Sequence, residues 1–371
     1  MMFKRTVVPL TLCLITSLPL ISHAEIDEKT REEIDFLKEE IIVLQDQLEE
    51  INIGSANRMS ISGYTDLEYK TSDQDGVEPG FRLHHMSLFF DKRLSDEWKF
   101  FSEIEYEDGP FSEFDFSNTD TESPCKGCSG KIFLEAVNFT YRWMPQVNLR
   151  GGRFFTPAGI WSVDHYPPFV ATQTRPQHIR KIFPQVIDGL TALGTLQFGS
   201  TFLNYDVYVG NGEGNSGKKD QNSEKSLGIK LSMVFPALEY VELGATVYSD
   251  TLNDNTDKQA TGAHLKIRFA DFTLQSEYAL ADLEPSTTAA YKQTGYYIQL
   301  LYNTTRMTYG IRHDYYDADD RDDEETTNNT MILNYHVSES IVLKLEHNLV
   351  ENQVAKDYQE TIGSIVIYLG N

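Results

Sequence analysis

The sequence predicts an all-β protein, a 16-stranded antiparallel transmembrane β-barrel preceded by a short N-terminal coiled-coil helix. Three observations predict this class. After residue 54, apolar and polar residues alternate with a period of two, in segments of about ten residues. Short polar turns alternate with long polar loops along the same stretch. A membrane-spanning helix needs about 18 consecutive apolar residues, and no such run occurs after residue 24.

Composition narrows the class further. The chain has 371 residues, with 56 Asp and Glu against 32 Lys and Arg, so its formal net charge is −24. This balance excludes a typical nucleic-acid binder, because Lys and Arg must displace the counterions of the phosphate backbone. Its 20 Tyr and 21 Phe supply much apolar surface, which argues against extensive disorder.

The first 24 residues have the pattern of a secretory signal peptide. Lys4 and Arg5 provide the positive start, residues 7–21 form the apolar segment, and Ser22-His23-Ala24 places small residues at the expected cleavage site. We therefore expect an exported protein.

Residues 25–53 are charged and helical in period. Apolar residues recur at alternating spacings of three and four, which is the a/d seam of a coiled coil. The seam consists of Ile34, Leu37, Ile41, Leu44, Leu48 and Ile51. A helix pair of this length is marginal alone, so we expect the seam to join subunits of an oligomer in the periplasm. The alternative is an amphipathic helix that packs on its own domain.

The barrel is predicted to occupy residues 58–371. In residues 340–349, for example, Ile341, Leu343 and Leu345 alternate with Lys344 and Glu346. One apolar and one polar face suit a strand between lipid and water. A soluble β-sandwich or propeller is the alternative, but it does not explain the alternation of turn lengths.

The connections predict the number of strands. Seven short links fall at residues 91–97, 143–146, 199–200, 236–237, 270–271, 303–304 and 337–339. Eight long links fall at residues 71–79, 108–131, 156–184, 211–225, 250–260, 282–290, 317–328 and 350–357. Together they predict 16 strands with both termini at the short-turn end, which is the outer-membrane pattern.

A barrel of this size leaves an aqueous channel that wall side chains do not fill, so a constriction would set its selectivity. The link 156–184 is the best candidate, because it mixes Trp161, Phe169 and Phe183 with charged residues. Its second half carries four basic residues, Arg175, His178, Arg180 and Lys181. These residues either form a positive collar that attracts anions, with His178 charged at lower pH, or pair with lumen carboxylates and fix the loop.

The strands carry charges of both signs on their polar faces. The charges expected to face the lumen are Lys230, Lys266, Arg268, Arg312, Lys344, Glu242, Glu277 and Glu346. Opposite charges on facing walls can create a transverse field without selecting one sign of ion.

No catalytic, metal or cofactor site is expected. The sequence contains no Gly-x-Ser-x-Gly, phosphate-binding loop or His-Glu-x-x-His motif. His84 and His85 are adjacent on a predicted strand, so we expect them to face opposite sides and not to ligate one metal ion together. Cys125 and Cys128 have no second Cys or His pair nearby, so in an exported chain they favour a small-loop disulfide over a metal site.

Several of these features together resemble the phosphate-selective porin O/P family of Gram-negative outer membranes. They are the signal peptide, the coiled coil, an opening Ser62-Gly63-Tyr64 strand, and Gly152-Arg153-Phe154-Phe155-Thr156-Pro157 before the third long loop. The resemblance implies a trimer of 16-stranded barrels in the cell outer membrane, each with an inward third loop, conducting small anions.

The sequence thus predicts a passive channel for small hydrophilic solutes, embedded in outer-membrane lipid as a homotrimer, without cofactor or enzymatic activity. The alternative is a structural or adhesive barrel with a closed pore, whose coiled coil contacts periplasmic partners. A closed barrel would show no conductance.

Overall fold

A computed structural model describes residues 59–108, 131–213, 222–322, 325–353 and 355–370. These residues form 16 strands and one short 3-10 helix, η1 (Pro236–Leu238). The first eight strands are β1 (Ser60–Ser72), β2 (Gly80–Arg93), β3 (Trp98–Glu107), β4 (Lys131–Met144), β5 (Val147–Phe155), β6 (Val186–Phe198), β7 (Thr201–Gly210) and β8 (Ser226–Phe235). The others are β9 (Val241–Thr251), β10 (Asp257–Phe269), β11 (Phe272–Glu284), β12 (Tyr291–Asn303), β13 (Met307–Asp317), β14 (Glu325–His336), β15 (Ile341–Asn352) and β16 (Tyr358–Tyr368).

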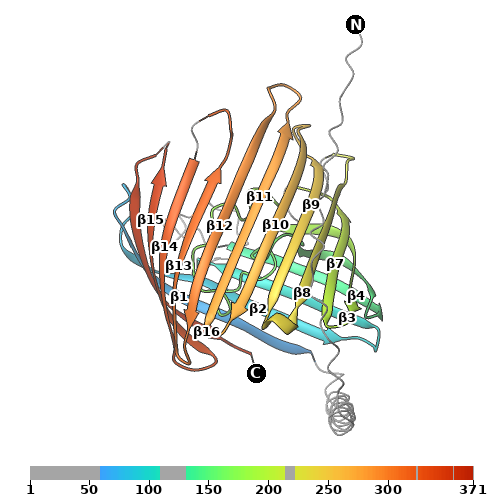
Figure 1. Ribbon diagram of the computed structural model, residues 1–371, viewed down its shortest axis with the longest axis horizontal. Coiled ribbons are helices and arrows are strands. Elements are labelled where there is room, and N and C mark those ends of the chain that lie inside the picture. Colours follow the sequence, from blue (N-terminus) through green and yellow to red (C-terminus); the bar gives the residue numbers. More distant parts are fainter. Residues whose placement is uncertain (1–58, 109–130, 214–221, 323–324, 354, 371) are drawn as a thin grey trace, which may run out of the picture. The chain divides into compact units, whose positions relative to one another are not determined.

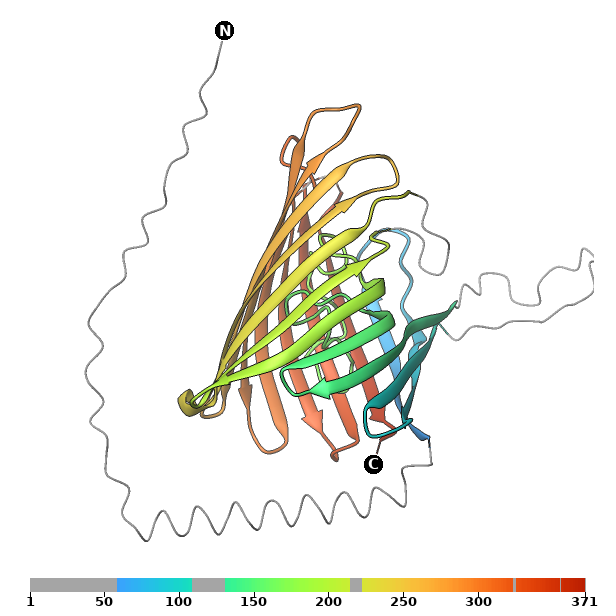
Figure 2. The same cartoon turned by 90° about the vertical axis from the view of Figure 1, so that its right-hand side faces the viewer.

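Each strand pairs antiparallel with its neighbours in sequence, and β1 pairs with β16 to close the barrel (Figures 1 and 2). The predicted 16-stranded antiparallel barrel is confirmed. Closure leaves no unpaired sheet edge, so every strand has a partner on both sides. The predicted signal peptide, coiled coil and Cys125–Cys128 disulfide lie outside the described residues. In the ranges given above, no helix is long and apolar enough to cross a membrane.

The alternation of side chains decides which face of each strand is apolar. On β15, Leu343 and Leu345 are 42% and 46% exposed on the outer surface, whereas Lys344 and Glu346 are 4% and 2% exposed. Successive side chains of a strand point to opposite faces, so the apolar set faces outward and the charged set inward.

The observed connections follow the predicted order, with one marked difference. The predicted loop 250–260 shrinks to residues 252–256, because β9 continues through Thr251 and β10 begins at Asp257. The polar residues that suggested a longer loop belong to the inner face instead. Lys258 is 2% exposed and pairs with Glu213 at 2.5 Å.

The strand register shifts at three places, one of which, between Arg142 and Met144, lies at the end of β4. The other two are β-bulges that interrupt the period of two. The register shifts between Asp66 and Leu67, which leaves His84 as the extra residue of β2. It shifts again between Glu103 and Ile104, which leaves Glu135 as the extra residue of β4. A bulge sets two successive residues opposite one partner and turns both to the same side.

The first bulge overturns one sequence-based expectation. His84 and His85 do not face opposite sides: their ring centroids lie 3.5 Å apart. The physical reason is the extra residue, because a strict two-residue period no longer holds where the ladder is interrupted.

Candidate functional site

Residues 156–185, called here the inner loop, connect β5 to β6 and fold into the barrel rather than over its mouth (Figure 2). Three short helical turns give the loop its shape. They are closed by main-chain hydrogen bonds to Ile160, Tyr166 and His178, whose carbonyls accept from residues three or four positions later. The loop is therefore compactly folded rather than extended.

The apolar half of the inner loop packs on the wall. Ile182 and Phe183 join a buried cluster with Phe154, Tyr208 and Tyr248. Trp161 is 1% exposed. Apolar side chains that would cost free energy in an aqueous channel are thereby removed from water.

Three wall cations hold the inner loop by its backbone carbonyls. Lys344 Nζ donates to the carbonyls of residues 167 and 170 at 2.5 and 2.7 Å. Arg312 Nη1 donates to the carbonyl of Thr174 at 3.0 Å, and also to the Thr172 hydroxyl at 2.6 Å. Lys230 Nζ donates to the carbonyl of residue 159 at 2.5 Å. Lys344 and Arg312 are 4% and 2% exposed. These predicted lumen charges face inward but are engaged by the loop.

Wall carboxylates hold the same loop by its N–H groups. Glu277 accepts the main-chain N–H of Trp161 at 2.9 Å. Glu346 accepts the N–H of Gln173 at 2.7 Å. Charge-assisted hydrogen bonds of this kind are about twice as strong as neutral ones. Cations and carboxylates on the surrounding strands therefore fix the inner loop across the lumen.

Gly159 permits one of these contacts. Its φ is +55°, and a Cβ atom at this position would collide with the carboxylate of Glu277. Glycine alone adopts such a φ without steric cost and lets a side chain approach the backbone this closely.

The remaining predicted lumen charges lie elsewhere on the wall. Glu242 accepts the hydroxyl hydrogen of Tyr240 at 2.6 Å and lies opposite Lys266 in the strand register. Arg268 is exposed and lies over the ring of Tyr240, 4.8 Å from its centroid. None of these three charges has a described contact with the inner loop.

The four basic residues in the second half of the inner loop occupy different surroundings. Arg180 is partly exposed, with Nη2 3.8 Å from Glu135 Oε1. Lys181 is exposed and lies over the ring of Tyr316, 4.2 Å from its centroid. Arg175 is half-buried. Burial, and then the charge of Arg175, lowers the pKa of Arg180 to about 10, so it remains a cation at neutral pH.

His178 is set apart from the other three. It is 2% exposed and stacks on Tyr297, with ring centroids 6.0 Å apart. Burial lowers its pKa to about 3, and the charges of Arg312 and Lys181 act in the same direction. His178 is therefore neutral at physiological pH.

An acidic cluster on β3 and β4 faces the basic half of the loop. Carboxylate oxygens of Glu103, Glu105 and Glu135 lie within 4.8 Å of one another. Tyr166 donates its hydroxyl to Glu103 at 3.0 Å, and His165 Nε2 lies 3.7 Å from Glu135 Oε2. Burial lowers the pKa of His165 to about 4, so this ring is neutral as well.

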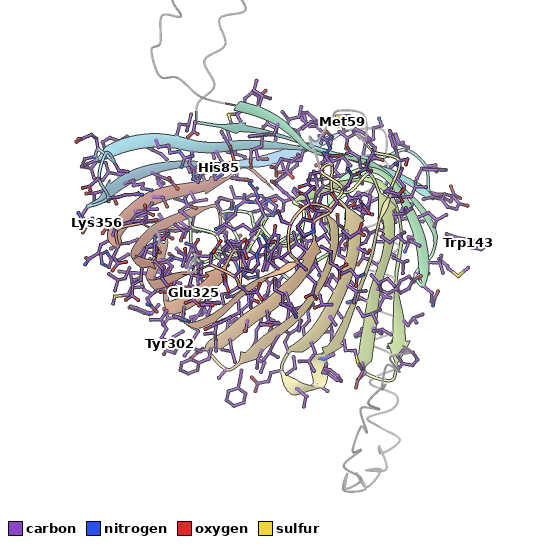
Figure 3. The ribbon with its side chains drawn as sticks, turned by 90° about the horizontal axis from the view of Figure 1, so that it is seen from above. Met59, His85, Trp143, Tyr302, Glu325 and Lys356 are labelled. Atoms are coloured by element: carbon purple, nitrogen blue, oxygen red, sulfur yellow. The ribbon has the colours of Figure 1, made fainter. Side chains whose placement is uncertain are left out.

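Sequence reasoning missed Glu135 and the inward pair His84 and His85. Viewed from above, His85 lies on the inner side of the wall, while Trp143 and Tyr302 lie at the outer circumference (Figure 3). The result is a channel whose interior carries both signs of charge around a fixed loop. Such an arrangement can constrict and orient passing solutes.

Comparison with known proteins gives three findings. The sequence profile of a family described as Gram-negative porin matches residues 109–355. An uncharacterized protein of Aquifex aeolicus (strain VF5) is 30% identical over 155 residues, which are 42% of this chain. The matched segment spans 32% of that relative's length.

Several solved structures, one of them described as a porin, have a similar fold. The anion-selective porin from Comamonas acidovorans gives a TM-score of 0.62 at 11% identity, covering 84% of this chain and 99% of that one. The OmpT loop-L8 deletion mutant of Vibrio cholerae gives a TM-score of 0.60 at 10% identity, covering 84% of this chain and 98% of that one. Salmonella typhi OmpF in complex with daunomycin gives a TM-score of 0.59 at 12% identity, covering 85% of this chain and 99% of that one.

Proposed function

The chain belongs to the Gram-negative porin family, and we propose that it is a passive channel for small hydrophilic solutes in the outer membrane. The observation that carries this proposal is the inner loop. It lies within a closed barrel and is held by wall residues on strands as far apart as β8 and β15. A narrowed aqueous passage lets solutes diffuse down their gradient without chemistry or cofactor.

We further propose that the passage favours small anions, phosphate-like oxyanions among them. Arg180 and Lys181 are exposed on the inner loop and Arg175 is half-buried. Guanidinium groups bind oxyanions with two parallel hydrogen bonds, which makes arginine well suited to them. The acidic cluster around Glu135 opposes this preference and keeps it weak.

The anion preference is tested by the reversal potential of single channels in a planar bilayer under a salt gradient. We expect a potential of anion-selective sign, shifted toward the cation side by the combined Arg175→Gln, Arg180→Gln and Lys181→Gln variant. Arg268→Gln serves as the matched control, because Arg268 is exposed but has no described contact with the inner loop. A cation-selective wild type would overturn the anion preference while keeping the channel.

Conductance itself tests the channel against the structural or adhesive barrel. Folded wild-type protein should insert and give steady current. Absence of any channel from folded protein would contradict the passive-channel proposal and favour the closed barrel.

We also propose that the working unit is a homotrimer surrounded by lipid. The apolar outer face, with residues such as Leu343 and Leu345 exposed, suits contact with lipid chains. The coiled-coil seam predicted over residues 25–53 would join the subunits. A Vibrio cholerae OmpT structure of similar fold is described as a trimer form (TM-score 0.58).

A further inference from the structure

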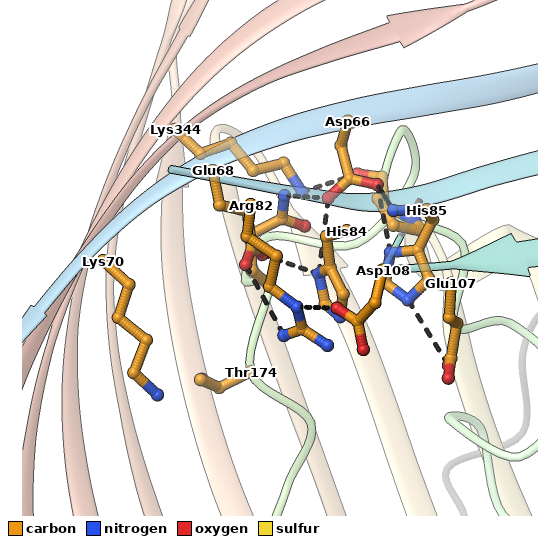
Figure 4. A network of polar contacts seen from close by, with 12 residues as sticks. Asp66, Glu68, Lys70, Arg82, His84, His85, Glu107, Asp108, Thr174 and Lys344 are labelled. Atoms are coloured by element: carbon orange, nitrogen blue, oxygen red, sulfur yellow. Dashed lines mark hydrogen bonds and ion pairs between the residues drawn. The ribbon is translucent and has the colours of Figure 1, made fainter. Parts of the chain in front are cut away.

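The bulge of β2 brings the metal-ligating side chains of Asp66, His84 and His85 together on the inner wall, with Glu68 beside His84 (Figure 4). His84 Nδ1 lies 2.7 Å from Glu68 Oε1 and 3.4 Å from Asp66 Oδ2. His85 Nδ1 lies 3.0 Å from Asp66 Oδ1. Ligand atoms at about 2.0–2.2 Å from one tetrahedral ion are separated by roughly 3.3 Å. The spacings from the two imidazoles to Asp66, 3.4 and 3.0 Å, are close to that value, whereas His84 and Glu68 are at hydrogen-bond distance.

We propose that Asp66, His84 and His85 form a binding site for one divalent transition-metal ion, with Glu68 beside His84. A mixed imidazole and carboxylate set suits Zn²⁺, Co²⁺, Ni²⁺ or Cu²⁺. Ca²⁺ and Mg²⁺ prefer sites made of oxygen ligands alone.

The site is held in place before any ion arrives. Asp66 and Glu68 are 1% and 2% exposed, and His85 is 4% exposed. The main-chain N–H of His85 donates to Asp66 Oδ1 at 3.1 Å, which ties the carboxylate to the bulge. Gln173 of the inner loop donates its side-chain amide to Asp66 Oδ2 at 2.9 Å. Fixed ligands lose little conformational freedom when they bind.

Charged side chains behind the proposed ligands lie where they can orient them, as in known metal sites. Glu107 Oε1 lies 3.9 Å from His85 Nε2, on the ring edge away from Asp66. A carboxylate behind a metal-bound imidazole orients the ring and raises its basicity. Arg82 Nη1 lies 3.9 Å from Glu68 Oε2 and pairs more closely with Asp108, at the end of β3.

The competing explanation is a cluster held by hydrogen bonds alone, in which His84 Nδ1 and His85 Nδ1 each bond to a carboxylate. Ligand atoms of Asp66, His84 and His85 lie within 4.8 Å of one another, which lets one ion between them contact all three. The nearby cations have other partners, since Lys344 donates to carbonyls of the inner loop and Arg82 pairs with Asp108.

The test is equilibrium binding of Zn²⁺, by titration calorimetry, to full-length folded protein purified without a histidine tag and stripped with a chelator. We expect one ion per barrel. His84→Gln and His85→Gln should each weaken binding by roughly tenfold or more, since even the groups behind metal ligands account for 10–100-fold. Binding should also weaken at pH 5, because protons compete for the imidazoles.

The matched control is the double variant His313→Gln and His347→Gln, which removes two histidines that bond to Asn329 and Thr361 instead. It should bind as the wild type does. Asp66→Asn tests the contribution of the carboxylate charge to binding, because asparagine has nearly the same size and shape and leaves no cavity. No saturable binding by folded wild type, or wild-type binding by the combined His84→Gln and His85→Gln variant, would overturn the proposal.

Discussion

The carboxylate of Glu346 on β15 accepts the main-chain N–H groups of Gln173 and Thr174, at 2.7 and 3.1 Å. Glu346 and Gln173 are 173 residues apart in sequence. Glu346 is 2% exposed, so water competes little for these bonds. The contact fastens the middle of the inner loop to the wall opposite β5 and β6, where the loop begins and ends.

Glu346→Gln should loosen this fastening. The amide keeps the shape of the side chain but removes its charge, and hydrogen bonds to charged groups contribute about 1.5–3 kcal/mol each. We expect a larger and noisier single-channel conductance and a lower thermal unfolding midpoint. Glu351→Gln, an exposed position on the same strand, is the control. An unchanged conductance in folded E346Q protein would contradict the anchoring role.

Gly159→Ala should disturb the start of the inner loop. The added methyl group occupies the place of the Glu277 carboxylate, so Glu277 must move and its bond to the Trp161 N–H is lost. The positive φ adds strain of about 1–2 kcal/mol. We expect a lower unfolding midpoint together with a changed channel conductance.

Gly199→Ala separates these two effects. Gly199 has a φ of +62° but no neighbouring atom within 4 Å of an added Cβ, so only the backbone strain remains. It should lower the unfolding midpoint without altering conductance. Equal effects of both substitutions on conductance would argue against the contact with Glu277.

His178→Gln should change how stability depends on pH. Burial lowers the pKa of His178 to about 3, whereas an unfolded histidine titrates near 6.5. Between these values the unfolded chain binds one more proton at this residue, so the free energy of unfolding falls as pH falls. Glutamine cannot take up that proton.

The measurement is the difference in unfolding midpoint between wild type and variant at pH 7 and at pH 4.5. The loss of stacking on Tyr297 lowers the variant's midpoint at pH 7, and the gap should narrow at pH 4.5. A constant gap for H178Q would mean that His178 is protonated within the folded protein.

Much of the barrel was predictable because lipid outside and water inside impose one simple pattern. Leu343, Lys344, Leu345 and Glu346 alternate without interruption, and the structure places them on opposite faces. The loop 250–260 was predicted too long because polarity was read as a loop signal. On β10, Lys258 is polar because it lines the interior and pairs with Glu213.

The inward pair His84 and His85 was missed because the strict two-residue period was assumed to continue. A signal was present in β2: outward apolar residues step from Leu83 to Met86, three positions rather than two. The same step, from exposed Leu134 to partly exposed Val137, marks the bulge that turns Glu135 inward. The pairing of each loop residue with its wall partner depends on tertiary geometry, which local periodicity does not encode.

Deleting residues 25–53 after the signal peptide tests the predicted coiled coil apart from the barrel. The barrel closes on itself through β1 and β16, so we expect the shortened chain to fold and conduct. If the seam joins subunits, the deletion should weaken the trimer, shifting cross-linked species toward monomer as protein is diluted.

Replacing the seam residues Leu37, Leu44 and Leu48 with Gln keeps the length of the segment and removes its apolar stripe. This variant should weaken the trimer as the deletion does, because the seam depends on burial of those side chains. The matched control replaces Glu39, Glu40 and Gln47, which lie off the seam, with Ala and should leave the trimer intact. If neither the deletion nor the Gln variant changes the oligomer, the segment packs on its own domain and the barrels associate without it.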